Sequence, residues 1–94
     1  MGKAMVKSSG NVFVDLGFSP EEADILQMRA DLMADLRQFI EKKKLTQVEA
    51  ARILGVSQSR VSDLVKGKWE KFSLEMLITL ATRAGMRVRL HRAA

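Results

Sequence analysis

Four polar residues that can read nucleotide bases lie close together in one stretch, Gln58, Ser59, Arg60 and Ser62. A glutamine amide can contact the N6/N7 edge of adenine with two hydrogen bonds, and an arginine guanidinium can do the same at the O6/N7 edge of guanine. At the start of a helix that enters the major groove, these side chains would face the base pairs. The alternative is that Gln58 and Arg60 are ordinary solvated surface residues.

A second set of residues around this stretch could hold phosphate. Gln47 is expected at the start of a helix, where an amide and the helix N-terminus bind anions, and Lys66 and Lys68 flank a glycine. Asp63 would repel phosphate, so we expect it at the periphery or paired with Arg60. The lysines at 42–44 end a long helix, where cations favour the negative end of the helix dipole.

The spacing of residues around these side chains predicts two short helices joined by a tight turn, a helix-turn-helix motif over residues 46–66. Ala51 precedes Gly55 by four residues, which provides a small side chain at the helix crossing and a turn residue that tolerates positive φ. Apolar residues fall where two such helices must bury their contact, at Leu54, Val56, Val61 and Leu64.

The boundaries of the two motif helices carry capping signals. Thr46 and Glu49 form the pattern of a capping box at the start of the first helix. Ser57 is a favourable N-cap for the second helix, and Gly67 ends it. Binding to double-stranded DNA is therefore the leading hypothesis.

A long helix is predicted before the motif. Ser19, Pro20 and Glu22 form a helix start, and no glycine or further proline follows until about Lys43. The apolar stripe of this helix is wider than one buried face needs. Part of it therefore meets a second subunit or another protein, or else packs on a second side within the domain. The stripe comprises Ile25, Leu26, Met28, Leu32, Met33, Leu36, Phe39 and Ile40.

A last helix is predicted after a loop at 68–72. Ser73 caps it and Gly85 ends it. In the loop, Trp69 and Phe72 are expected to cover the core rather than to stack on bases. Four residues of the last helix recur at helical spacing and should complete the core, namely Leu74, Leu77, Ile78 and Ala81.

Residues 86–91 alternate between apolar and basic side chains, which predicts a short C-terminal β-strand. A single strand in a helical domain has unpaired edges and needs a partner. The candidates are the apolar segment 11–18 as a second strand, the same strand of a second subunit, or a strand of a different protein. The segment 11–18 could instead be an arm, and residues 1–10 are expected to form a flexible tail before a single domain at 11–94.

Composition excludes several classes of function. The chain of 94 residues has no cysteine and a single histidine, His91, so no metal site is expected, and no cofactor-binding motif or catalytic set is present. There is no apolar run of membrane-spanning length and no secretory signal, so we expect a cytoplasmic protein that is not an enzyme. Residues 1–41 carry a net charge of −3 and residues 42–94 of +8. The basic half suits phosphate binding, and the mildly acidic half suits either solvent or a basic protein partner.

At the motif the sequence resembles the Cro and phage-repressor type of helix-turn-helix proteins, the XRE family. The matching residues are Leu45, Thr46, Gln47, Ala50, Ala51, Leu54 to Gln58, Val61, Ser62 and Gly67. The resemblance implies a mostly α-helical, lambda-repressor-like bundle of four to five helices with the short C-terminal strand. It also implies that Gln47 contacts backbone phosphate and that Gln58 contacts bases. The glutamate that usually precedes the final glycine is replaced here by Val65 and Lys66.

Over about residues 11–91 the chain is also similar to small HigA-like antitoxins. The similarity lies in the 11–18 segment, the helix start at 19–23, the cap at 72–74 and the arginine-rich end. It implies pairing with a RelE- or HigB-like toxin and repression of the chain's own operon as a homodimer.

We therefore expect a dimeric, sequence-specific repressor that reads an inverted-repeat operator, with half-sites about one turn apart. The dimer would use the final strand and an exposed helix face, so that deletion of 86–94 leaves a monomer. A stand-alone regulator without a toxin, or a protein-interaction adaptor, are the alternatives.

Overall fold

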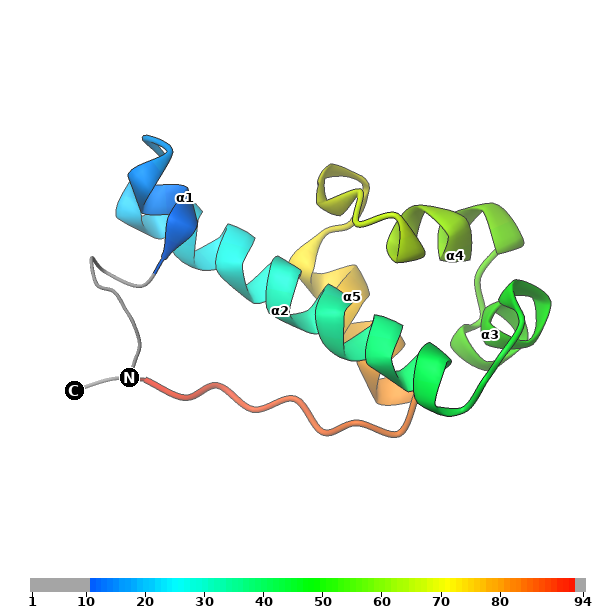
Figure 1. Ribbon diagram of the computed structural model, residues 1–94. Helices are drawn as coiled ribbons and strands as arrows, with labels where there is room; N and C mark the ends of the chain where they lie inside the picture. The colour runs from blue at the N-terminus through cyan, green and yellow to red at the C-terminus, as the bar shows by residue number, and fades with distance from the viewer. Residues whose placement is uncertain (1–10, 93–94) are drawn as a thin grey trace.

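The computed structural model describes residues 11–92, which form a bundle of five α-helices with one 3₁₀ turn (Figure 1). The mostly α-helical fold is confirmed, whereas the tail expected at residues 1–10 lies outside the described residues. The elements in chain order are α1 (Val12–Asp15), α2 (Pro20–Lys42), α3 (Gln47–Leu54), α4 (Gln58–Val65), η1 (Trp69–Lys71) and α5 (Leu74–Arg83).

Helix α2 is the longest element. Helices α1, α4 and α5 and the η1 turn pack along it, whereas α3 packs on α4 and α5 (Figure 1). It begins with the predicted capping box, in which the Ser19 hydroxyl accepts a hydrogen bond from the backbone N–H of Glu22 and the Glu22 carboxylate accepts one from that of Ser19. It ends at Lys42 with a Schellman motif that has no glycine. Lys44 adopts φ 53°, and the N–H of Leu45 donates to the Ile40 carbonyl at 3.0 Å.

The segment 11–18 forms the short helix α1, not a strand. The Asn11 side chain accepts a hydrogen bond from the N–H of Phe13, and its amide donates to the Ala23 carbonyl at 3.1 Å. The Phe13 ring makes edge contacts with Phe18 and with Trp69, each with ring centroids 6.1 Å apart. A local cap and packing on α2 therefore decide the conformation of a segment that is too short for its own pattern to do so.

The core lies where α2, α3, α4 and α5 meet, and its residues are completely or almost completely buried. As predicted, Phe72 covers the core, and Leu54, Val61 and Leu64 are buried where the two motif helices meet.

In α5 the fully buried positions are Leu77, Leu80 and Ala81, whereas Leu74 and Ile78 are only half-buried. The core cluster comprises Met33, Leu36, Ile40, Ala50, Leu54, Val61, Leu64, Phe72, Leu77 and Leu80.

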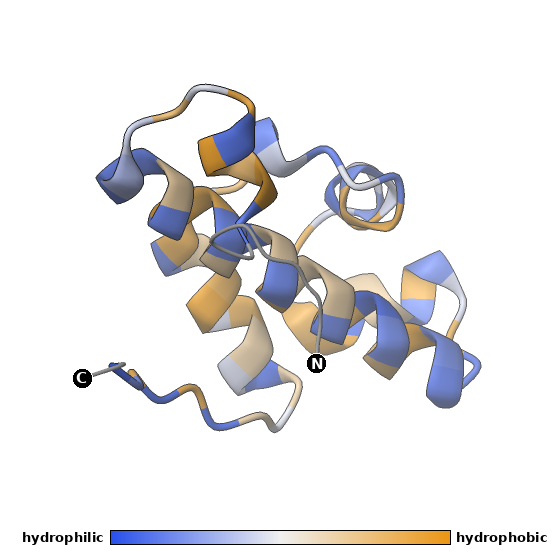
Figure 2. Cartoon of the chain, turned by 60° about the vertical axis from the view of Figure 1, so that its left-hand side comes forward, coloured by the Kyte–Doolittle hydropathy of each residue, from blue (hydrophilic) through white to orange (hydrophobic). Residues whose placement is uncertain are grey.

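The predicted strand at 86–91 is wrong for the described chain, because no β-strand occurs within residues 11–92. Residues 87–92 instead run in an extended path back along α2 (Figure 1). Figure 2 shows the alternation of hydrophilic and hydrophobic residues along this C-terminal segment. The sequence alternates as a strand does, but a β-strand also needs hydrogen bonds to a neighbouring strand. The segment 11–18, which was one candidate for that neighbour, is helical.

Candidate nucleic-acid interface

Helices α3 and α4 form the predicted helix-turn-helix, and each begins with a side-chain cap. The Thr46 hydroxyl accepts a hydrogen bond from the N–H of Glu49 at 3.1 Å, and the Glu49 carboxylate accepts one from the N–H of Thr46 at 2.8 Å. The Ser57 hydroxyl accepts from the N–H of Arg60 at 3.1 Å. These bonds fix the first turn of each helix, including the turn that presents Gln58.

The turn between the two helices depends on Gly55, which has φ 70° in the left-handed region. A Cβ atom at this position would lie 2.9 Å from a terminal nitrogen of Arg83. The same nitrogen, Nη1, donates a hydrogen bond to the Leu54 carbonyl at 2.9 Å. Arg83 therefore caps the C-terminus of α3 from the last turn of α5 and holds the motif turn from outside.

Arg83 is not among the site residues that the sequence predicts. Its place in the last turn of a helix is explained locally by the helix dipole. The contact with Leu54 spans 29 positions of the chain, and no sequence pattern connects the two residues.

The predicted base-contacting residues differ in their surroundings. Gln58 and Ser59 are exposed in the first turn of α4, and Ser62 is half-buried one turn later. Gln47 is exposed at the first position of α3. Residues four apart are neighbours on the same face of a helix, so Gln58 and Ser62 lie one above the other on α4.

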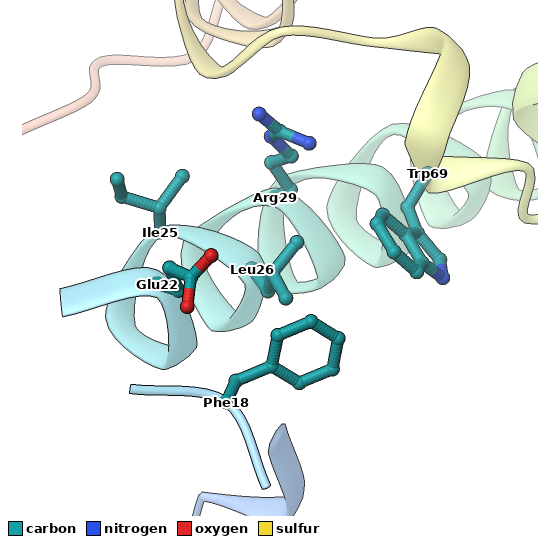
Figure 3. Close-up of a pocket in the computed structure, with 6 residues that line it drawn as sticks. All are labelled: Phe18, Glu22, Ile25, Leu26, Arg29 and Trp69. Carbon is teal, nitrogen blue, oxygen red and sulfur yellow. The ribbon is translucent and has the colours of Figure 1, made fainter. Parts of the chain in front are cut away.

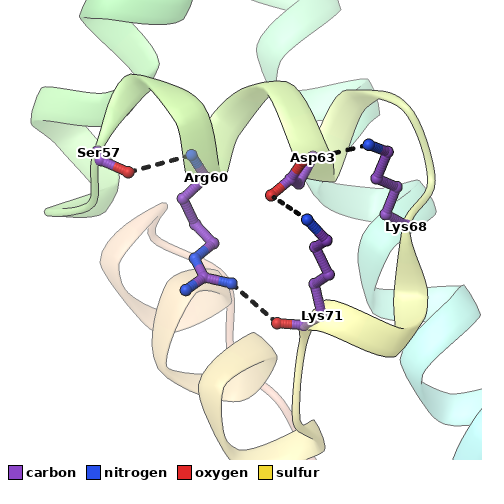
Figure 4. A network of polar contacts seen from close by, with 5 residues as sticks. All are labelled: Ser57, Arg60, Asp63, Lys68 and Lys71. Carbon is purple, nitrogen blue, oxygen red and sulfur yellow. Dashed lines mark hydrogen bonds and ion pairs between the residues drawn. The ribbon is translucent and has the colours of Figure 1, made fainter.

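Arg60 lies beside these residues but contacts its own domain (Figure 4). Its Nη1 donates a hydrogen bond to the Lys71 carbonyl at 2.9 Å, and its guanidinium carbon lies 5.5 Å from the centre of the Phe72 ring. A guanidinium has five N–H donors, so one internal hydrogen bond leaves donors for a further partner. Arg60 thus joins the candidate recognition helix to the loop that precedes α5.

Asp63 pairs with lysines of that loop rather than with Arg60 (Figure 4). Its two carboxylate oxygens lie 3.8 Å from the Nζ atoms of Lys68 and Lys71, respectively. The expected pairing with Arg60 is corrected, because Arg60 turns toward the Lys71 carbonyl and the Phe72 ring. Lys66 and Lys68 are both exposed at the C-terminal end of α4.

A small cavity lies at the other end of the molecule, between the α1 region and η1 (Figure 3). Its volume is about 240 Å³ and its lining is mostly apolar. The Nε atom of Arg29 is buried there without a hydrogen-bond partner, but in Figure 3 the guanidinium points away from Phe18 and Trp69. The residues around the cavity are Phe18, Glu22, Ile25, Leu26, Arg29 and Trp69.

No helix among residues 11–92 is both long and apolar enough to span a membrane. The same residues contain no cluster of three or more histidine, cysteine or acidic side chains that could hold a metal ion.

Known proteins share this arrangement of helices. The sequence profile of a family described as "Helix-turn-helix domain" matches residues 12–92. The chain belongs to this family. A solved structure named "Putative XRE Family Transcriptional Regulator" has 33% sequence identity and a TM-score of 0.72, with 78% of this chain and 82% of that chain covered. No curated protein matches the sequence significantly. The chain is therefore an XRE-type helix-turn-helix protein.

Proposed function

We propose that this XRE-type helix-turn-helix protein is a sequence-specific transcriptional repressor that binds double-stranded DNA with α4 in the major groove. The observation that carries the proposal is the capped α3–α4 pair, which leaves Gln58 and Ser59 exposed at the start of the second helix. Side chains at this position reach base edges when such a helix docks. Ser62 and the remaining donors of Arg60 extend the base-contacting surface along α4.

Phosphate contacts complete the proposed interface at both ends of the motif. Gln47 is exposed at the N-terminus of α3, where the free backbone N–H groups favour an anion. Lys66 and Lys68 are exposed after α4, and the ion pair of Lys68 with Asp63 is long at 3.8 Å. These contacts would fix the register of the protein on DNA without reading sequence.

The proposed binding unit is a homodimer on an inverted-repeat operator. Two copies would place their recognition helices about 34 Å apart, one helical turn of DNA. Sedimentation of the protein with and without a two-site operator DNA gives the stoichiometry directly. A single protomer bound to the two-site DNA would contradict the dimer.

The test of sequence-specific binding is Gln58→Ala, with Gln38→Ala as the matched control. Gln38 is also an exposed glutamine, and it lies on α2, outside the motif. Titration of DNA from upstream of the gene, at near-physiological salt and against scrambled competitor, should show a loss of about 1–3 kcal/mol for Gln58→Ala and none for Gln38→Ala. If the wild-type protein binds both DNAs equally, its binding is phosphate attraction alone and the repressor proposal fails.

We further propose that the protein is the antitoxin of a type II toxin–antitoxin pair, with a basic, RelE- or HigB-like protein as its partner. The resemblance to HigA-like antitoxins motivates this, and the surface of α1 and the first half of α2 supports it. Leu16 is 68% exposed and Val12 is 55% exposed there. Residues 11–41 carry seven acidic and two basic side chains, which suits a basic partner with an apolar contact surface.

Co-expression with the product of a neighbouring gene tests the antitoxin role. The partner should arrest growth alone and copurify with this chain, and Leu16→Glu should weaken the complex without changing operator affinity. A stand-alone regulator would bind its operator with no copurifying partner. An adaptor would retain protein partners while Gln58→Ala has no effect on DNA.

A further inference from the structure

The backbone N–H and C=O groups of the C-terminal segment 87–92 form no hydrogen bonds with the rest of the described chain. The last backbone hydrogen bond in the described residues joins the Met86 N–H to the Ala81 carbonyl at 2.9 Å. From Arg87 to Arg92 the chain follows an extended path, and its side chains alternate in type (Figure 1). Extended backbone with free N–H and C=O groups is a template for a further strand.

An apolar groove lies beside this segment. It has a volume of about 420 Å³ and runs between α2, the start of α5 and the segment itself. Leu90 is 77% exposed and Val88 is 39% exposed, although both line the groove. The half-buried Leu74 and Ile78, which the sequence pattern places in the core, belong to the groove instead. Its apolar lining comprises Met28, Leu32, Leu74, Ile78, Val88 and Leu90.

The choice of partner strand follows from the alternation. The segment 11–18 is excluded, since it forms α1. Two copies of this segment could pair as antiparallel strands related by a two-fold axis. Residues directly opposite each other then point to the same face of the ribbon, and the axis keeps the basic side chains of both copies on one face. The basic side chains of one copy therefore lie opposite those of the other in every register. Arg87 and Arg89 would then face arginine or His91 across the pair, and like charges directly opposite each other are destabilising.

We propose that residues 87–92 and the adjoining groove form an open β-edge that accepts an extended strand of a different protein, with apolar and acidic residues in alternation. Its apolar side chains would fill the groove beside Val88 and Leu90, while its carboxylates would pair across the ribbon with Arg87 and Arg89. Asp31 is the one acidic residue that lines the groove, and its carboxylate accepts a hydrogen bond from the Gln27 amide at 3.0 Å. The surface is separate from the DNA-binding motif, so its occupation does not depend on the proposed function.

Two short capped peptides test the proposal with the full-length protein. One alternates valine with glutamate and the other alternates valine with lysine, and each is titrated at low salt up to millimolar concentration. The glutamate peptide should shift the backbone amide NMR signals of residues 87–92 and bind about tenfold tighter than the lysine peptide, with the difference shrinking as salt is added. Operator binding by the same samples should be unchanged.

Charge reversal of the segment provides the matched test. The double variant Arg87→Glu with Arg89→Glu should reverse the preference in favour of the lysine peptide. Arg52→Glu with Lys66→Glu, an equal charge change on exposed residues of the motif, should keep the original preference. Equal binding of both peptides, tighter binding of a peptide copied from residues 85–92, or no shift with any peptide would each overturn the proposal. The second of these results would point to a second copy of the chain.

Discussion

The two ends of α2 are packed in opposite ways. Around its C-terminal half, α3, α4 and α5 bury a continuous core, and the motif turn is held by Gly55 and Arg83. Around its N-terminal half, α1 has no buried residue and leaves several large apolar side chains exposed. Tight packing therefore coincides with the part that must present α4 in one fixed orientation. The loosely packed end carries the exposed apolar side chains to which the proposed partner protein would bind.

Truncation of one leucine at each end is the strongest test of this difference. Leu54 is fully buried and Leu16 is largely exposed. Leu54→Ala should lower the free energy of unfolding by about 2–5 kcal/mol, because it removes buried methyl groups and leaves a cavity. Leu16→Ala should change it by less than about 0.5 kcal/mol. Urea unfolding measures both, and similar losses would mean that α1 is as much part of the core as α3.

Alanine substitution of one glycine at each end of the molecule tests the same difference in packing. Gly55 and Gly17 both have positive φ, but a Cβ atom at Gly55 would meet Arg83, whereas one at Gly17 has nothing within 4 Å. Gly55→Ala should therefore destabilise by about 2–3 kcal/mol, from backbone strain and loss of the Arg83 cap, and Gly17→Ala by about 1 kcal/mol. Combining Gly55→Ala with Arg83→Met should cost less than the sum of the single changes. If the losses of stability measured by thermal unfolding simply add up in the double variant, the contact between position 55 and Arg83 is contradicted.

Arg60 tests whether the recognition helix is held by the loop before α5. Arg60→Met keeps the apolar stem but removes the hydrogen bond to Lys71 and the contact with the Phe72 ring, and should cost about 1–2 kcal/mol of stability. Arg52→Met is the control, since Arg52 is exposed on α3. Stability measured in the absence of DNA separates this internal role from base contact. Equal stability of the two variants would show that the Arg60 contacts are incidental.

The end of α2 gives the smallest expected effect, with the opposite sign. Lys44 occupies a left-handed conformation at φ 53° that glycine adopts without steric cost. Lys44→Gly should stabilise the protein by up to about 1 kcal/mol, whereas Lys42→Gly, two residues earlier in the last helical turn, should destabilise it by about the same amount. Chemical denaturation of both variants measures whether each change raises or lowers the free energy of unfolding.

Most of the fold could be predicted because its signals are local. The capping boxes at Ser19 and Thr46, the cap at Ser57 and the turn at Gly55 each involve residues within four positions of one another, and each is found in the structure. The end of α2 was placed correctly even though its Schellman motif uses Lys44 in place of glycine.

The parts that could not be predicted depend on distant contacts. The apolar pattern of 11–18 fits a strand or an arm, and the hydrogen bond from Asn11 to the Ala23 carbonyl favours a helix docked on α2. The pattern of 86–91 is that of a strand, but whether a ladder forms depends on a neighbour that the chain does not provide within residues 11–92. Within the candidate site, exposure of Gln58 follows from the motif, whereas the partners of Arg60 and Asp63 come from the loop before α5.

The length of α2 has a consequence for how binding events combine. Its 23 residues extend about 35 Å at 1.5 Å per residue, with α1 at one end and the motif turn beyond the other. The motif turn therefore lies far from α1, but the end of α4 does not, because the Phe13 ring contacts Trp69, the residue that follows the proposed phosphate contact Lys68. In a gel-shift experiment, a partner at α1 that slows the operator complex further would leave the DNA backbone at Lys68 accessible, whereas a partner that dissolves the complex would cover it.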